Sequence, residues 1–269
     1  MTISTTPVNN ELNQYSDVIS TVKKHASYAG SGLGITLCCH PFDLLSHSIA
    51  SGRAYPVSLE DFKQRNVRSI VFGLYRGSLT SLSINAGKNW FSLFVANSVG
   101  EKIEDSYQRA LVRGGIIGTV DLLGTPLSCI KNQVLVGMYK PKEALSLKNL
   151  KDTLSLSRNA FWVSGAVRFL WPVLYFNTME AVIQDEDSKF HKIIGGMGAG
   201  ALTAFILQPA QVVKINQQVS GLGMKECIKH LASQSGAKRF LWGTPWAMMG
   251  GTIFGGIFAH LLKDPEKKA

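Results

Sequence analysis

Six long stretches of the chain are apolar and poor in charge, and polar segments separate them. Three of the stretches contain no Asp, Glu, Lys or Arg, and the other three carry charge near their centres. In chain order they are residues 25–42, 77–100, 114–139, 159–179, 193–213 and 240–262. A helix of this length crosses roughly 30 Å of hydrocarbon. The pattern therefore predicts an all-α membrane protein with six transmembrane helices.

The connections between these stretches differ in charge. The three long connections, residues 53–76, 140–158 and 222–239, together hold 14 Lys or Arg and 5 Asp or Glu. The two short connections, residues 101–113 and 184–192, hold 5 and 6. In a six-helix arrangement the long connections share one side, and loops on the inner side of a membrane are enriched in Lys and Arg. We therefore expect both chain termini on the opposite, outer side.

Two landmarks recur along the chain with a nearly constant period. The first landmark is a proline, and the three prolines are 85 and 83 residues apart. A glycine lies eleven residues before each proline. The second landmark lies at or near the start of the next apolar stretch and recurs every 83 residues. The prolines are Pro41, Pro126 and Pro209, the glycines are Gly30, Gly115 and Gly198, and the second landmarks are Gly77, Ala160 and Gly243. A fixed period indicates tandem structural units. The landmarks predict one domain, residues 1–269, with repeats at about 18–103, 107–185 and 188–263, each a helix pair joined by a short amphipathic helix.

Composition narrows the class of function. The net charge of +10 favours anionic partners. Only 17% of the residues are charged, which is below the roughly 25% typical of soluble domains. The four cysteines lack metal-ligand spacing and are interpreted as buried thiols. No nucleotide-binding glycine loop, zinc-protease motif or nucleophile elbow occurs. We therefore expect no enzyme, no cofactor and no metal, and, because the basic residues flank the apolar stretches, no nucleic-acid partner.

The joint spacing resembles the mitochondrial carrier family of solute transporters. The family repeat reads Pro-x-acid-x-x-basic and later acid-Gly-x4-aromatic-basic-Gly, and here both motifs are reduced. Asp43 supplies the only acid of the first motif, Lys131 and Lys214 supply the only bases, and Tyr75-Arg76-Gly77 keeps the second motif best. The resemblance covers the whole chain through its period, so the chain is interpreted as a divergent member. Reduced motifs fit either a fast-evolving eukaryotic carrier or a carrier acquired by an intracellular bacterium and delivered into host mitochondria.

The resemblance implies a gate on the matrix side, formed where three proline-kinked helices converge around a pseudo-threefold axis. By position, its pairs are Asp43 with Lys131, Ser128 with Lys214, and Gln211 with Ser46. Only the first is an ion pair, so we expect a weaker lock and less dependence on strict exchange. The alternative is that Pro41, Pro126 and Pro209 are packing kinks without a gating role.

The resemblance also implies substrate contacts on the second helix of each repeat, seven and eight residues past the second landmark. Together with a neighbouring lysine and an acid of the third apolar stretch, the predicted substrate-binding residues are Asn85, Lys88, Asp121, Val167, Arg168, Gly250 and Gly251. Arg168 is the leading candidate, because a mid-membrane guanidinium binds phosphate or carboxylate. Its alternative role is a structural pair with Asp121 or Glu180. The opposite gate is poorly kept, with Asn97, Glu180 and Lys263 at its acid positions.

These residues predict transport of an anionic metabolite, with nucleotides such as ATP ahead of di- or tricarboxylates, by exchange or uniport. The alternatives are a carrier-derived adaptor or insertase that no longer transports, and a leaky or proton-coupled pore. The expected partners are the lipid bilayer, including anionic lipid such as cardiolipin, and the small anionic substrate. We expect a functional monomer in the mitochondrial inner membrane with both termini in the intermembrane space. The first seventeen residues contain acids and no Lys or Arg, unlike a presequence.

Overall fold

The structure, a computed structural model, describes residues 6–53, 60, 63–100, 102–140, 143, 146–183 and 188–262. Within these residues the regular secondary structure is helical and contains no strand. The prediction of an all-α protein is confirmed, and most described residues of each of the six apolar stretches lie in helices. The prediction of three repeats stays a prediction, and residues 185 and 263, at which two of them end, lie outside the described residues.

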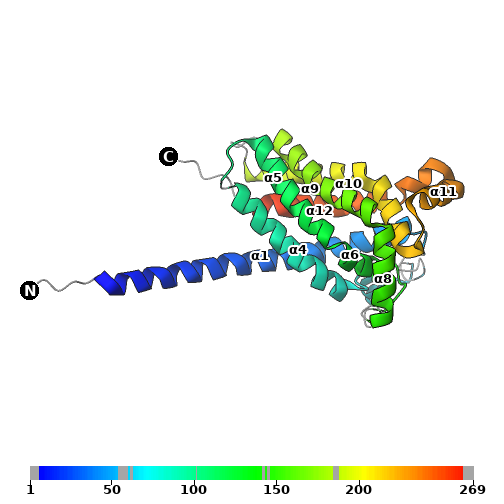
Figure 1. The fold of residues 1–269 in the computed structure, drawn as a ribbon, viewed down its shortest axis with the longest axis horizontal. Coiled ribbons are helices and arrows are strands. Elements are labelled where there is room, and N and C mark those ends of the chain that lie inside the picture. The colour runs from blue at the N-terminus through cyan, green and yellow to red at the C-terminus, as the bar shows by residue number, and fades with distance from the viewer. Residues whose placement is uncertain are drawn as a thin grey trace, which may run out of the picture.

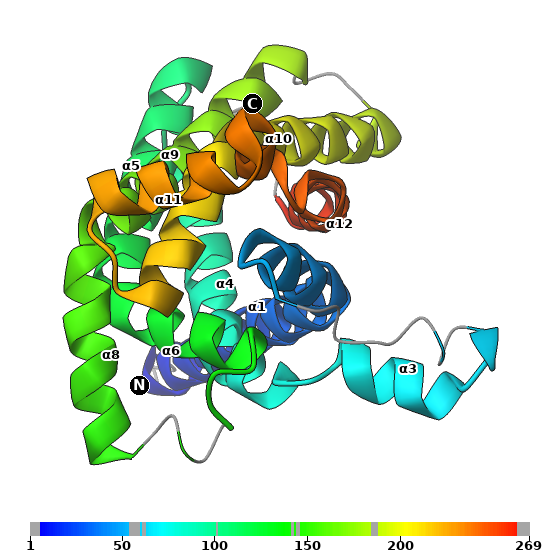
Figure 2. The ribbon, with the colours of Figure 1, turned by 90° about the vertical axis from the view of Figure 1, so that its right-hand side faces the viewer.

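The long helices run along a common direction and form the body of the molecule (Figure 1). They are α1 (Thr6–Ala50), α4 (Ser78–Gly100), α5 (Ser106–Leu123) with α6 (Thr125–Leu135), α9 (Phe161–Val182), α10 (Lys189–Ser220) and α12 (Thr244–Leu261). Each packs on the next in chain order, and α12 packs on α1. The helices therefore close into a ring, which Figure 2 shows from one end.

One end of the ring carries the remaining helices, and we call it the proline end because Pro41, Pro126 and Pro209 lie toward it. These helices are α3 (Val67–Leu74), α8 (Leu147–Asn159), α11 (Met224–Ser235) and the 3-10 helix η1 (Gly236–Leu241). They occupy the long connections, where the sequence predicts amphipathic helices. The second landmarks Gly77, Ala160 and Gly243 directly precede α4, α9 and α12. The period of the sequence is therefore the spacing of three helix starts.

The three prolines do not act alike. Pro41 and Pro209 lie inside α1 and α10, which continue through them as single helices. In the second repeat the helix breaks at Gly124, and the axes of α5 and α6 meet at 68°. Pro126 then occupies the first turn of α6, where a missing backbone N–H costs no hydrogen bond. The prediction of three equivalent kinks is wrong in this respect, because Gly124 moves the second break upstream of its proline.

Glycines allow the two helices of each predicted repeat to pack closely. They are not the glycines that precede the three prolines by eleven residues. A Cβ on Gly30, Gly115 or Gly198 would meet no atom within 4 Å. Their sequence neighbours make the close approaches instead, because they face the partner helix. Gly32 lies against Ala86 and Trp90 of α4, Gly114 and Gly118 lie against Val173 and Phe169 of α9, and Gly200 lies against Gly251 of α12.

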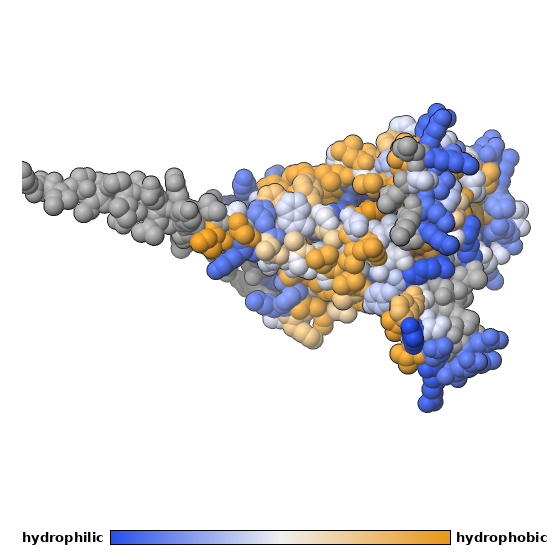
Figure 3. Space-filling model, turned by 90° about the horizontal axis from the view of Figure 1, so that it is seen from below, coloured by the Kyte–Doolittle hydropathy of each residue, from blue (hydrophilic) through white to orange (hydrophobic). Residues whose placement is uncertain are grey.

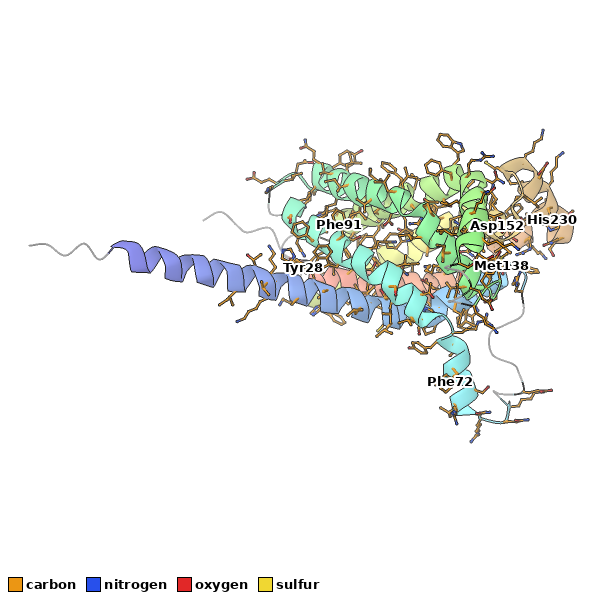
Figure 4. The ribbon with its side chains drawn as sticks, turned by 60° about the horizontal axis from the view of Figure 1, so that its bottom comes forward. Tyr28, Phe72, Phe91, Met138, Asp152 and His230 are labelled. Atoms are coloured by element: carbon orange, nitrogen blue, oxygen red, sulfur yellow. The ribbon has the colours of Figure 1, made fainter. Side chains whose placement is uncertain are left out.

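The apolar core fills the end of the ring opposite the proline end. It draws residues from all six long helices, among them Leu93, Tyr175 and Phe258. Figure 4 labels Tyr28 of α1, which belongs to this cluster, and Phe91 of α4, which packs against it. A second cluster packs Cys227 and Leu231 of α11 against α10. Three cysteines are buried as predicted, and Cys38 is exposed.

By length and composition, one helix among the described residues, α10, is apolar enough to cross a membrane. The bent pair α5 and α6, taken as a single span, would be a second. The prediction of six membrane spans is therefore not confirmed. The reason lies in helices such as α4, where serine and asparagine residues that face the interior of the ring lower the mean hydropathy.

Candidate functional site

A cavity of about 220 Å³ lies inside the ring and is lined by residues of all the long helices. The predicted substrate-binding residues and the predicted gate residues all line it, although the chain separates them by up to about two hundred positions. They are Asp43, Ser46, Asn85, Lys88, Asp121, Ser128, Lys131, Val167, Arg168, Gln211, Lys214, Gly250 and Gly251. The three prolines do not line the cavity. The structure thus brings the two predicted sets into one site.

Two ion pairs cross the cavity wall. Lys88 of α4 lies 3.0 Å from a carboxylate oxygen of Asp121 on α5, and this aspartate is buried. Lys131 of α6 lies 3.7 Å from Asp43 of α1, whose side chain is 37% exposed. Sequence reasoning paired Asp43 with Lys131 but did not pair Lys88 with Asp121. The position of Lys88 one helical turn beyond Ile84 predicted that it lies on the cavity face, whereas its partner depends on how α4 and α5 pack.

Arg168 of α9 contacts Asp121 through the backbone. Its Nη1 donates to the main-chain oxygen of Asp121 at 2.8 Å, and its buried Nε has no hydrogen-bond partner. The Oδ1 of Asp121 is also buried without a partner. Arg168 is therefore joined to Asp121 through the backbone oxygen, as a structural pair would be, whereas the carboxylate oxygen Oδ2 of Asp121 pairs with Lys88. Arg168 keeps unused donor capacity beside the cavity.

Glu180 of α9 belongs to a different ion cluster. Its two carboxylate oxygens accept hydrogen bonds from Nε and Nη2 of Arg109 at 3.0 and 2.9 Å, and from Nη1 of Arg113 at 3.1 Å. Arg113 also donates to the carbonyl oxygen of Ala96 on α4 at 2.7 Å. The cluster ties α4, α5 and α9 together near the end opposite the proline end, and it excludes a pair between Arg168 and Glu180. The two arginines, four residues apart on α5, were not singled out from sequence.

The other two predicted gate pairs do not form among the described residues. No hydrogen bond joins Ser128 to Lys214 or Gln211 to Ser46 within this part of the chain, and Oε1 of Gln211 is buried without a partner. At the opposite gate, Asn97 is buried, and Lys263 lies outside the described residues. The predicted six-residue gate therefore contains one direct interaction, between Asp43 and Lys131.

Buried amides hold the second and third repeats together instead. Asn132 Nδ2 of α6 donates to Oε1 of Gln218 on α10 at 2.5 Å, and Gln218 Nε2 donates to Ser164 Oγ of α9 at 3.2 Å. Gln133 Nε2 donates to the Gln218 carbonyl oxygen at 3.2 Å. Sequence reasoning missed this network, because its residues lie beside the predicted gate positions rather than on them.

An aromatic group closes the cavity toward the end opposite the proline end. Trp171 and Tyr175 of α9 stack with ring centres 5.3 Å apart, and Phe254 of α12 meets Trp171 edge-on at 4.8 Å. Phe258 contacts Tyr175 edge-on at 5.9 Å. Trp171 and Tyr175 follow Arg168 by three and seven residues, so helical periodicity could have placed them on the same face.

The two predicted substrate-binding glycines of α12, Gly250 and Gly251, allow close helix packing. Gly251 lies directly against the backbone of Gly200 on α10, where no larger side chain fits. A Cβ on Gly250 would lie 3.3 Å from Cβ of Phe42 on α1. Both glycines line the cavity, but their lack of a side chain lets α12 pack closely on α10 and α1.

The site contains cations, amides, hydroxyls and aromatic rings. Within the part of the chain that the structure describes, no group of three or more His, Cys, Asp or Glu side chains is placed to hold a metal ion. The lining side chains are suited to binding an anion through charge-assisted hydrogen bonds. They lie inside a ring of helices, which is the arrangement of a transport protein with a central binding site.

Comparison with known families agrees with this class. Residues 185–262 match the family described as mitochondrial carrier protein, and this range coincides closely with the third predicted repeat. No curated protein matches the chain. The match covers less than half of the chain, and over this part the chain is similar to the mitochondrial carrier family, whose members are solute transporters and typically lie in the mitochondrial inner membrane.

Proposed function

We propose that this protein carries a nucleotide such as ATP across the mitochondrial inner membrane by alternating access. One observation carries the proposal: the central cavity is lined by four cationic side chains and two carboxylates. Lys88 and Lys131 are each paired with a carboxylate, so Arg168 and Lys214 remain without one among the described residues. A cavity with two uncompensated cations favours a ligand that carries at least two negative charges.

The outer surface supports a membrane location. Large apolar side chains are exposed along the flanks of the ring, including Leu123, Trp162, Phe169 and Phe205. Figure 3 shows apolar residues over the flank and hydrophilic residues gathered at one end. At the proline end, α3 exposes apolar residues beside arginines, and Figure 4 shows Phe72 on this helix standing away from the ring. Such a surface suits a bilayer with anionic lipid, with the basic connections on the matrix side.

The aromatic group supports a nucleotide over other anions. The phosphates would bind Arg168 and Lys214, and the base would stack on Trp171, one turn beyond Arg168 on the same helix. Arg168 Nε and Asp121 Oδ1, both buried without partners, offer a donor and an acceptor at the same place. A ligand that uses both would relieve the cost of leaving them unpaired.

The size of the cavity favours a second candidate, a di- or tricarboxylate. The volume of about 220 Å³ is below the roughly 300–1,000 Å³ of pockets that hold drug-sized ligands. A small carboxylate fits this space directly, whereas a nucleotide requires the ring to open at one end. Two uncompensated cations suit a dicarboxylate as well as a phosphate chain.

The test is uptake into liposomes that contain the purified protein, with labelled ATP, ADP, malate and citrate offered separately. We expect saturable ATP uptake that unlabelled ATP competes for, with and without internal substrate. Preferred uptake of malate or citrate would replace the nucleotide with the second candidate. Absence of uptake for the whole panel by folded, inserted protein would contradict transport and favour a carrier-derived adaptor or insertase.

A further inference from the structure

One buried cation at the proline end of the cavity has no counter-charge. Lys214 of α10 is only 5% exposed, it lines the cavity, and no carboxylate lies within ion-pair distance of it among the described residues. Its expected partner position holds Ser128, whose hydroxyl carries no charge. The nearest carboxylate that acts on it, that of Asp43, is already bound to Lys131.

The surroundings of Lys214 increase the excess of positive charge. Arg168, Lys131 and Lys88 all lie close enough to act electrostatically on Lys214. Taking an ammonium group out of water costs several kcal/mol in real proteins unless an opposite charge compensates it. The neutral amide network of Asn132 and Gln218 supplies hydrogen bonds between α6 and α10 but no negative charge.

We propose that the proline end of the cavity binds a small inorganic oxyanion, such as phosphate, against Lys214 and Ser128. The ammonium group donates to one oxygen of the anion, and the Ser128 hydroxyl donates to another. Gln211, whose amide has an unpaired buried oxygen, lines the same end, and its NH2 group adds a third donor. The anion takes the place of the carboxylate that the second repeat lacks.

This site has a consequence that rests on the proposed function. With an anion bound, Lys214 has a negative partner where the second and third predicted repeats meet. Asp43 and Lys131 form the corresponding pair where the first and second predicted repeats meet. Closing of the proline end then depends on anion occupancy. A phosphate group of the substrate and a free phosphate ion offer the same chemistry, so the two sources must be separated by experiment.

The experiment measures thermal unfolding of the purified full chain in detergent, with phosphate added against gluconate at equal ionic strength. We expect phosphate to raise the unfolding temperature in a saturable way. Lys214→Gln should weaken the apparent phosphate affinity at least tenfold, since the loss of a hydrogen bond to a charged group costs about 1.5–3 kcal/mol. Arg168→Gln should weaken the phosphate response less than Lys214→Gln does, because Arg168 already donates to the backbone oxygen of Asp121.

Ser128→Asp is the decisive variant. It introduces a carboxylate at the cavity-lining position that the carrier resemblance pairs with Lys214, so it should raise the unfolding temperature without phosphate and remove the phosphate response. A Ser128→Asp variant that still responds to phosphate as the unchanged protein does would overturn the proposal. The same holds if Arg168→Gln abolishes the response while Lys214→Gln keeps it, since the anion would then occupy the substrate site.

Two further arms separate this inference from the proposed function. Phosphate stabilisation that is lost in both Lys214→Gln and Ser128→Asp supports the anion site even if no substrate is transported. ATP uptake by a protein that shows no phosphate stabilisation overturns the anion site and leaves transport standing. An ATP-induced stabilisation that needs both Arg168 and Lys214, with none from phosphate alone, would assign the anion to the substrate and contradict a separate inorganic ion.

Discussion

The helix pairs of the second and third repeats share one packing device and differ in charge. In the second, Gly114 and Gly118 let α5 approach α9, and the Glu180 cluster adds three charge-assisted hydrogen bonds. In the third, Gly196, Gly200 and Gly251 let α10 and α12 touch through their backbones, and within the described residues no ion pair joins these two helices.

The two helix pairs therefore contribute differently to the stability of the ring and to ligand binding. The third pair depends on close packing alone, and it is the part of the chain that matches the mitochondrial carrier family. The second pair combines packing with charge, and it supplies Asp121, Arg168 and Trp171 to the cavity. Substitutions in the two pairs should therefore affect stability and transport differently, and the following predictions test that separation.

The largest effect on stability is expected for Glu180→Gln. Arg109 and Arg113 are buried, and the change removes the carboxylate that both guanidinium groups bind. Breaking a buried charge pair in this way costs about 3–5 kcal/mol. Thermal unfolding in detergent should show a large loss, whereas Asp152→Asn on the exposed surface of α8 should show none. Equal unfolding temperatures for the two variants would mean that packing, not the ion cluster, holds the second pair.

Arg168→Ala should remove function without a comparable loss of stability. The side chain contributes one hydrogen bond to a backbone oxygen, so the ring should still form. Loss of a charge-assisted bond to the substrate should lower affinity roughly tenfold to a hundredfold. In liposome uptake, Arg168→Lys should recover only part of the activity, because an ammonium cannot make the planar two-point contact. Lys229→Ala on the surface of α11 is the control variant.

Two outcomes would contradict this assignment of Arg168. Near-normal uptake by Arg168→Ala would remove the arginine from the site and move the leading role to Lys88. Lost uptake together with lost stability would show that its bond to the Asp121 backbone is structural. Unfolding of the same samples must therefore be followed in parallel.

Gly200→Ala should destabilise the third pair by about 1–3 kcal/mol, because the added methyl group would collide with the carbonyl oxygen of Gly251. Gly198→Ala is the matched control, since a methyl group at position 198 of the same helix would meet no atom within 4 Å. Its stability should be unchanged or slightly higher, as alanine favours helix over glycine. If both variants lose the same stability, close packing of α10 on α12 is not what holds the third pair.

The smallest effect is expected where the first and second repeats meet. Asp43 is partly exposed and its pair with Lys131 spans 3.7 Å, so Asp43→Asn should cost only about 0–1 kcal/mol. The expected change is kinetic: a weaker lock should raise uptake that proceeds without internal counter-substrate. Unchanged uptake rate and unchanged dependence on counter-substrate would show that this pair is not part of a gate.

Helix positions and helix starts follow from the sequence pattern, and the residues of the cavity follow from the carrier resemblance. Apolar stretches of sufficient length predict where the long helices lie, and the second landmarks mark the residues directly before α4, α9 and α12. The carrier resemblance, applied at the period of the landmarks, names the site residues, and these residues line one cavity. These features depend on hydrophobicity, chain length and spacing, and each can be counted along the chain.

The partners of individual side chains are decided only by the tertiary structure. Successive residues of a helix point about 100° apart, so a small rotation changes which residue faces a neighbour. Gly32 and Gly200 make the close contacts instead of Gly30 and Gly198, and Lys88 rather than Arg168 takes the Asp121 carboxylate. Helix rotation is set by packing against every neighbour in the ring at once, and no local pattern in the sequence contains that information.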